Sequence, residues 1–370
     1  MSTMKALQYN RPTKTLTLRE IPIPKIVRED DVLVKVAFSG ICGTDLHAIK
    51  GNYPTAEHDV TLGHEFCGIV MEVGSDVKNV KVGSEVTVDP YRGCFKCRHC
   101  AGGNPQFCIY EGPRNALGFF RDGGWAEYCL APAQQVHRIP PEINLSLELA
   151  CLVETLSTIQ HGCDRIGIIP HDARVLIIGA GIIGILYACI FHLHGHRQCM
   201  ISEPSAERRE RINVLELGYQ TMTPDETRAI MTEAMKDLEH DGLDYVIDCS
   251  GYAPAVEEAF QWLRKGGHLC FFGVAPPTSK ISISPNQMFH KELTILGTLT
   301  NPFCYPKATA LTAALGKRYL DFEKLAIETF ELSDYEKALS KLASGTDWGH
   351  LQPREIVNER DQPRIRRPDI

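Results

Sequence analysis

The chain has 370 residues, of which 44% are hydrophobic and 23% are charged, and its formal net charge is −7. This length is too great for one ordinary hydrophobic core, so the sequence predicts two domains. The composition is typical of a soluble globular protein, and because no basic block of five or more residues occurs, we expect no nucleic-acid or membrane partner. The first residues lack the apolar stretch of a secretory signal, which favours a cytoplasmic location.

Residues 1–157 are predicted to form a mostly β domain. Asp31–Gly40 and Glu85–Pro90 alternate apolar and polar side chains, as strands do when one face is buried. Phe66–Val77 is predicted to be a strand bent by its glycines. A cysteine-containing lobe is expected at about residues 90–112 of this domain.

Residues 158–297 show a different pattern, in which short apolar strands alternate with helix-length segments. The predicted strands are Val175–Gly179, Cys199–Glu203, Tyr245–Cys249, Leu269–Gly273 and Leu293–Gly297. The predicted helices are Ile182–His194, Ala206–Leu217 and Ala253–Leu263. Such βαβ units predict an α/β domain with a Rossmann-type, doubly wound parallel sheet.

The C-terminal part is expected to return to the first domain over residues 298–347. Residues 348–370 are polar, contain three prolines and show no strand pattern, so they are predicted to be a loose tail.

Four of the 14 cysteines form a compact motif with the spacing C-x2-C-x2-C-x7-C: Cys94, Cys97, Cys100 and Cys108. Four thiolates can enclose a tetrahedral Zn²⁺ ion with no open position, which is a structural site. An iron–sulfur cluster is an alternative, but the bacterial motif has proline after its last cysteine, where this chain has Ile109. Two disulfides would require an oxidising compartment.

A second set of candidate metal ligands is dispersed over three segments. The segments are GICGTDLH with Cys42, Thr44, Asp45 and His47, LGHEFCG with His64 and Glu65, and CLVETLS with Glu154. Together they offer the sulfur, nitrogen and oxygen ligands that catalytic zinc uses, with one position left for substrate. Of the two acids, either Glu65 or Glu154 could bind the metal directly while the other holds the ligands from outside. Asp45 is a candidate to orient the His64 imidazole through its second ring nitrogen.

The segment VLIIGAGIIG places Gly179, Gly181 and Gly184 directly after a predicted strand, with Ile182 and Ile183 opening a helix. This context is the one that a dinucleotide-binding glycine loop requires. Glu203 ends the next strand, where an acid accepts hydrogen bonds from ribose hydroxyls and repels a 2′-phosphate. The sequence therefore predicts NAD, with NADP as the alternative because Arg208 and Arg209 follow closely.

With these motifs, residues 1 to about 345 resemble the medium-chain zinc-dependent alcohol dehydrogenase superfamily. The segment Gly63–Val77 fits its zinc signature, and the cysteine loop fits its structural-zinc lobe. GICGTDLH, Glu65 and LVETLS are most similar to the branch of sorbitol, other polyol and threonine dehydrogenases. The chain departs from this branch in having Thr155 where proline is usual, and in its polar C-terminus.

The resemblance implies a GroES-like catalytic domain, two zinc ions per chain and a homodimer or homotetramer. It implies that Cys42, His64 and Glu65 hold the catalytic zinc and that Glu154 binds this metal directly or contacts its water. It also implies that Thr44 and His47 relay the substrate proton.

The expected activity is oxidation of a polyol or secondary alcohol to the ketone, with a substrate similar to sorbitol, xylitol or arabinitol. The alternatives are L-threonine 3-dehydrogenase, a 2,3-butanediol-type alcohol dehydrogenase and a catalytically silent structural relative. Tyr53, Phe119 and the turn Thr300–Phe303 are candidates to line the substrate cleft.

Overall fold

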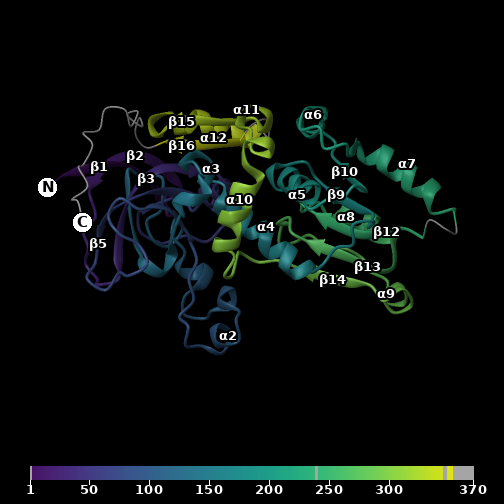
Figure 1. Cartoon of the computed structure of the whole chain (residues 1–370), viewed down its shortest axis with the longest axis horizontal. Helices are drawn as coiled ribbons and strands as arrows, with labels where there is room; N and C mark the ends of the chain where they lie inside the picture. The colour runs from purple at the N-terminus through teal and green to yellow at the C-terminus, as the bar shows by residue number, and fades with distance from the viewer. Residues whose placement is uncertain (1, 238–240, 345–347, 353–370) are drawn as a thin grey trace.

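In a computed structural model, the chain forms two halves, each built on its own sheet, with helix α10 (Tyr305–Tyr319) between them (Figure 1). The structure describes residues 2–237, 241–344 and 348–352. Within these ranges, no helix combines the length and the apolar character needed to cross a membrane.

The first half contains a seven-stranded sheet with the order β15-β16-β3-β5-β6-β8, in which β7 also pairs with β3. Its strands are β3 (Asp31–Gly40), β5 (Phe66–Val73), β6 (Glu85–Val88), β7 (Tyr128–Pro132), β8 (Val136–Arg138), β15 (Ile327–Glu331) and β16 (Trp348–Gln352). Every second residue of β3 from Val32 to Val36 is buried against Phe66 and Val70 of β5. A smaller sheet has the order β2-β1-β4, with β1 (Thr3–Asn10), β2 (Thr15–Pro22) and β4 (Val60–Thr61).

The strand β16 corrects the expectation of a loose tail from residue 348. Residues 348–352 pair in parallel with β15 and in antiparallel with Ser39 and Gly40 of β3. Leu351 is completely buried among side chains of the first half. The tail prediction is therefore wrong for these residues. Their sequence shows no strand pattern, but pairing with β15 and β3 provides hydrogen-bond partners for their backbone groups. Its remaining part, 353–370, lies outside the described residues.

The second half contains a six-stranded parallel sheet with the order β11-β10-β9-β12-β13-β14. Its strands are β9 (Val175–Ile178), β10 (Cys199–Ser202), β11 (Gln220–Met222), β12 (Leu243–Asp248), β13 (Leu263–Phe271) and β14 (Thr294–Gly297). Counted along the chain, this is the strand order 3-2-1-4-5-6 of dinucleotide-binding domains, so the predicted Rossmann-type sheet is confirmed.

Helices cover both faces of this sheet. They are α4 (Val153–Ile166), α5 (Ile182–Leu193), α6 (Ala206–Asn213), α7 (Pro224–Ala234), α8 (Ala253–Gln261) and α9 (Pro285–Lys291). Val175 and Ile177 of β9 pack on the face with α4, α5 and α10, whereas Leu176 and Ile178 pack on the face with α7 and α8. This alternation follows the two-residue period of a strand.

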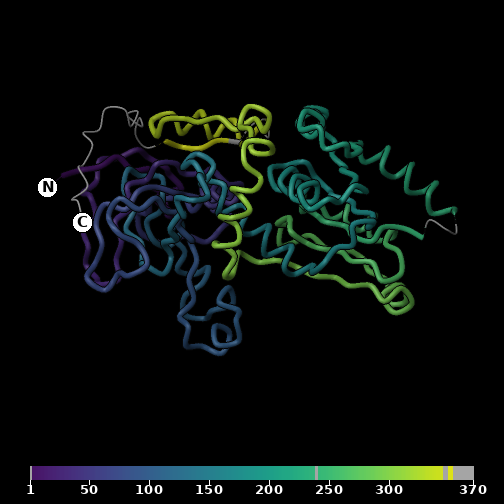
Figure 2. The backbone as a smooth tube through the Cα atoms, viewed as in Figure 1, coloured from purple at the N-terminus to yellow at the C-terminus, as the bar shows by residue number. Residues whose placement is uncertain are grey.

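The elements that connect the halves also position the candidate site. Helix α4 continues across residue 157, so the predicted domain boundary falls inside a helix. The short helices α3 (Leu147–Ala150), α11 (Phe322–Leu325) and α12 (Tyr335–Ser344) belong to the first half, as does α1 (Gly43–Ile49). The cysteine lobe, with α2 (Arg98–Ala101), projects from the first half as a separate loop (Figure 2).

Candidate metal centres and cofactor cavity

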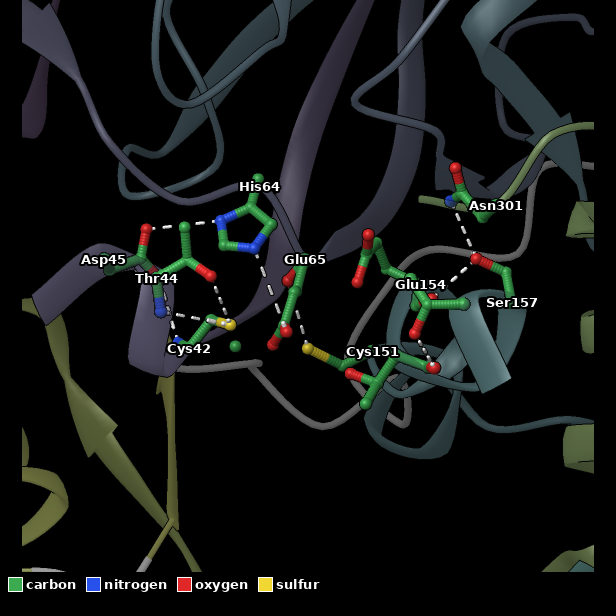
Figure 3. A network of polar contacts seen from close by, with 12 residues as sticks. Cys42, Thr44, Asp45, His64, Glu65, Cys151, Glu154, Ser157 and Asn301 are labelled. Carbon is green, nitrogen blue, oxygen red and sulfur yellow. Dashed lines mark hydrogen bonds and ion pairs between the residues drawn. The ribbon is translucent and has the colours of Figure 1, made fainter. Parts of the chain in front are cut away.

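Three of the predicted catalytic ligands, Cys42, His64 and Glu65, come together. Cys42 is the N-cap of α1, and His64 and Glu65 directly precede β5. One sulfur, one nitrogen and one carboxylate oxygen from these residues all lie within 4.8 Å of one another (Figure 3). This donor set and spacing fit a zinc ion with a fourth position open to substrate.

Asp45 orients two of these ligands from a fully buried position. Its Oδ2 accepts a hydrogen bond from the backbone N–H of Cys42 at 2.9 Å, and its Oδ1 lies 3.2 Å from His64 Nδ1. The Asp45 carboxylate therefore keeps the proton on Nδ1 and leaves Nε2 as the metal-binding nitrogen. His64 Nε2 lies 4.0 Å from Glu65 Oε1, on the side of the other ligands.

The position of Glu65 depends on Gly40 at the end of β3. The backbone N–H of Gly40 donates to the carbonyl oxygen of Glu65 at 2.6 Å. A Cβ atom at residue 40 would collide with the Glu65 carboxylate, so glycine is required here to leave room for this ligand.

Burial and mutual charge shift the pKa values of this group. Burial raises the pKa of Cys42, and the Glu65 carboxylate raises it further. Burial lowers the pKa of His64, but the Asp45 carboxylate and the Cys42 hydrogen bond outweigh it, so the net pKa is raised. Burial also raises the pKa of Glu65. Ionisation of both Cys42 and Glu65 would place two negative charges close together in a buried site, which is unfavourable. A bound divalent cation would offset these charges.

Glu154 lies close to this group but, among the described residues, is not one of the three that could share a metal ion. It is buried in the first turn of α4, and burial raises its pKa to about 8. Ser157 Oγ donates to the Glu154 carbonyl oxygen at 2.6 Å, and Asn301 Nδ2 donates to Ser157 Oγ at 2.8 Å. The carboxyl group thus suits an outer partner better than a direct ligand in this conformation.

The two predicted proton-relay residues lie on α1. The Thr44 hydroxyl oxygen is 3.5 Å from the Cys42 sulfur, so it borders the candidate metal position. His47 is exposed one turn further along the same helix. This order, from ligand to solvent, is the one that a proton relay needs.

The cysteine lobe brings Cys94, Cys97, Cys100 and Cys108 together as a second group of four ligands. Cys97 Sγ and Cys108 Sγ are 3.9 Å apart. This separation exceeds the ~2.05 Å of a disulfide and agrees with the roughly 3.8 Å between sulfurs of a tetrahedral zinc site. Backbone N–H groups of Cys97 and Glu111 donate to Cys94 and Cys108 sulfurs, which stabilises thiolates. The lobe therefore fits a closed, structural zinc ion.

The glycine loop borders a cavity of about 1140 Å³ at the carboxyl ends of β9, β10 and β12. Gly179 has φ +97°, which permits the tight turn, and Gly181 caps α5. A Cβ atom at Gly184 would collide with the Gly179 carbonyl oxygen, so the third glycine allows the helix to approach the strand. Ile182 and Ile183 begin α5 and are partly buried behind this loop.

Glu203 has a role in this cavity that the sequence did not indicate. Its Oε2 accepts from the backbone N–H of Ala180 at 2.8 Å, and its Oε1 accepts from that of Ser205 at 2.9 Å. The carboxylate therefore ties the glycine loop to the turn after β10. Arg208 Nη1 lies 4.0 Å from Glu203 Oε2, and both residues line the cavity.

Sequence reasoning missed Asp89, and it named Asn301 only as part of the turn Thr300–Phe303. Asp89 follows β6, and Asn301 is completely buried beside Ser157. The only signal in the sequence is their position, since Asp89 lies just before the cysteine lobe and Asn301 lies in the turn after β14.

Comparison with known proteins agrees with this geometry. Residues 28–141 match the model of the alcohol dehydrogenase GroES-like domain, and residues 182–314 match that of the zinc-binding dehydrogenase family. D-arabinitol dehydrogenase 1 of Uromyces fabae is 31% identical over 343 residues, which cover 92% of this chain and 94% of that protein. L-threonine 3-dehydrogenase of Coxiella burnetii is 30% identical over 351 residues, which cover 92% and 97%.

Among solved structures, a zinc-binding dehydrogenase of Sinorhizobium meliloti bound to NADP superposes with a TM-score of 0.84 at 33% identity, covering 95% of this chain and 100% of that one. The expected fold, a Rossmann-type domain with a GroES-like domain, is thus confirmed. The chain belongs to the medium-chain zinc-dependent alcohol dehydrogenase superfamily and is a zinc- and NAD(P)-dependent oxidoreductase.

Proposed function

We propose that the chain oxidises a polyol, or a closely related secondary alcohol, to the ketone and transfers the hydride to NAD⁺. The observation that carries the proposal is the group Cys42, His64 and Glu65, with the buried acid Glu154 beside it. The similarity to D-arabinitol dehydrogenase 1 supports a polyhydroxylated substrate. The intact ligand set speaks against a catalytically silent relative.

The chain's own residues supply binding, orientation and proton transfer. A Zn²⁺ ion held by these three residues would act as a Lewis acid on the substrate hydroxyl and lower its pKa. Thr44, whose Oγ1 borders the metal position, would accept the substrate hydroxyl proton while it releases its own hydroxyl proton toward the exposed His47 and solvent. Phe119 packs against the His64 ring with centroids 4.6 Å apart, and Tyr53 packs on Phe119, which excludes water from this side.

The choice of NAD depends on Glu203, whose carboxylate lies at the edge of the cofactor cavity. A 2′-phosphate placed beside it would meet a buried negative charge, which disfavours NADP. Arg208 is the feature that favours NADP, and the Sinorhizobium meliloti relative is bound to NADP. Comparing kcat/KM with NAD⁺ and with NADP⁺ tests the cofactor preference. A clear preference for NADP⁺ would overturn this part of the proposal.

The substrate is tested with a panel of sorbitol, xylitol, arabinitol, L-threonine and 2,3-butanediol. We expect the highest kcat/KM with one of the three polyols. L-Threonine is the second candidate because of the Coxiella burnetii relative, and a preference for it would contradict the polyol proposal. A preference for 2,3-butanediol would point to a smaller substrate.

We further propose a homodimer or homotetramer that pairs through the cofactor half. Among the described residues, β14 is an edge strand with a partner on one side only, and large apolar side chains of the neighbouring segments are exposed, among them Val274 and Phe289. Light scattering that gives the 41.3 kDa of a single chain would contradict this state.

A further inference from the structure

The buried side chain of Asn301 joins the turn after β14 to the beginning of α4. Asn301 is 1% exposed, and its Nδ2 donates a hydrogen bond to Ser157 Oγ at 2.8 Å. Ser157 is completely buried, and its hydroxyl donates to the carbonyl oxygen of Glu154 at 2.6 Å (Figure 3). Two hydrogen bonds in series therefore connect Asn301 to the backbone of the acid that lies beside the candidate metal ligands.

The turn that carries Asn301 has an unusual backbone. Thr300 and Phe303 have φ angles of +53° and +59°, in the left-handed region that residues with a Cβ atom rarely adopt. Such conformations are unfavourable, persist only where surrounding contacts hold them, and are concentrated at functional sites. The buried hydrogen bond from Asn301 to Ser157 is one contact that holds this turn in place.

Asp89 approaches Asn301 from the first half of the molecule. It directly follows β6, and its Oδ1 accepts a hydrogen bond from the backbone N–H of Tyr91 at 2.9 Å. Gln135 fixes the backbone of Asp89, because its carbonyl oxygen accepts from the Asp89 N–H at 2.7 Å and its Nε2 donates to the Asp89 carbonyl at 2.8 Å. Burial raises the pKa of Asp89 to about 8, whereas hydrogen bonds from Tyr91 and Asn301 act to lower it. Asn301 is thus held between a fixed carboxyl group and α4.

The position of Glu154 depends on its backbone. Among the described residues, no hydrogen bond or ion pair reaches the Glu154 carboxyl group, as Figure 3 illustrates. Leu152, the N-cap of α4, has no side chain that could cap the helix, so the first turn lacks this common support. The hydrogen bonds of Ser157 and Asn301 therefore supply a long-range contact that fixes this turn.

We infer that Asn301 is a positioning residue for the reaction: acting through Ser157, it holds the first turn of α4 so that the Glu154 carboxyl group stays beside the metal position. The inference rests on the proposed function, in which Glu154 acts next to the catalytic metal. It adds a residue that does not itself touch the substrate, since Asn301 is buried against Ser157.

The experiment measures kcat and KM for the best alcohol substrate, at saturating cofactor, in the full-length protein and its variants. Asn301→Ala removes the donor to Ser157, Ser157→Ala removes the hydroxyl that continues the series, and a double variant combines both changes. Thr312→Val is the matched control, because the completely buried Thr312 hydroxyl donates within α10, to the Ala308 carbonyl at 2.7 Å.

We expect each single variant to lower kcat about tenfold with little change in KM, as for loss of an outer partner, whereas the control keeps the wild-type kcat. Because both substitutions interrupt the same series of hydrogen bonds, the double variant should also lose about tenfold, not the roughly hundredfold of independent effects. Metal analysis should find both zinc ions in every variant. If Asn301→Ala does not fold, Ser157→Ala decides alone, because it removes only one oxygen atom from the same series.

The outcomes separate this inference from the proposed function. If the wild-type protein oxidises an alcohol and the variants keep its kcat, the inference is wrong and the proposed function stands. A higher KM at unchanged kcat would place Asn301 in substrate binding, and release of the catalytic zinc would place it among the supports of the ligands; either result overturns the inference, as do losses that multiply in the double variant. If the wild-type protein oxidises no alcohol, the proposed function fails, and the inference fails with it.

Discussion

Asp45 provides a sharp test of how the catalytic metal site is built. Its two carboxylate oxygens serve two different N–H donors, the backbone of Cys42 and the ring nitrogen Nδ1 of His64. Asn has the same shape but only one oxygen. In Asp45→Asn, one of these buried donors therefore loses its acceptor, and the imidazole loses its negatively charged partner.

The magnitude follows from the type of bond that is lost. A hydrogen bond to a charged group contributes about 1.5–3 kcal/mol, and 1.4 kcal/mol corresponds to a factor of ten in affinity. We therefore expect the zinc affinity of the catalytic site to fall about 10- to 100-fold, as is usual for loss of an outer partner. The cysteine lobe has no contact with Asp45, so its zinc should stay bound.

The assay is competition for zinc between the protein and a chromophoric chelator, which gives the Kd of the weaker site. Asp76→Asn, at an exposed carboxylate in the same half, controls for the loss of one negative charge. An unchanged Kd in a normally folded Asp45→Asn protein would refute the assigned role. A loss of both zinc ions would show that the variant acts through folding instead.

Three further predictions concern stability. Leu351→Ala should reduce the free energy of unfolding by about 2–5 kcal/mol in urea, because Leu351 is completely buried; no change would mean that β16 is not packed as described. Burial lowers the pKa of His350 from 6.5 to about 4, so the unfolded chain binds the extra proton and stability should fall as pH drops from about 6.5 to 4, by up to about 3 kcal/mol at about 1.4 kcal/mol per unit. His350→Phe should reduce this dependence of the free energy of unfolding on pH, and an unchanged dependence would mean that other groups cause it. Cys97→Ser should release the lobe zinc and lower Tm while the catalytic zinc remains; retention of both ions would contradict the structural site.

Much of the fold could be predicted because its signals are local. The predicted strand Asp31–Gly40 coincides with β3, and the predicted strand Val175–Gly179 ends one residue beyond β9. Each segment shows its burial in its own sequence pattern. In contrast, β16 could not be predicted, because its partners β15 and β3 decide the pairing and only tertiary packing buries Leu351.

For the candidate site as well, the sequence indicated which residues take part but not how their side chains are arranged. The residue types of Cys42, His64 and Glu65 were sufficient to propose a metal centre, and the structure brings them together. The sequence could not place Glu154 relative to them, nor show that both oxygens of Glu203 already bind backbone N–H groups. These details depend on side-chain conformations and on loops that are distant in sequence.

The central claim is that each chain holds two zinc ions and that oxidation occurs at the one bound by Cys42, His64 and Glu65. Metal analysis of the purified protein, combined with turnover of its best alcohol substrate, tests it directly in wild type and Cys42→Ser. We predict about two zinc ions per wild-type chain, and one zinc ion with no turnover in the variant. A Cys42→Ser protein that keeps both zinc ions and full activity would contradict the account.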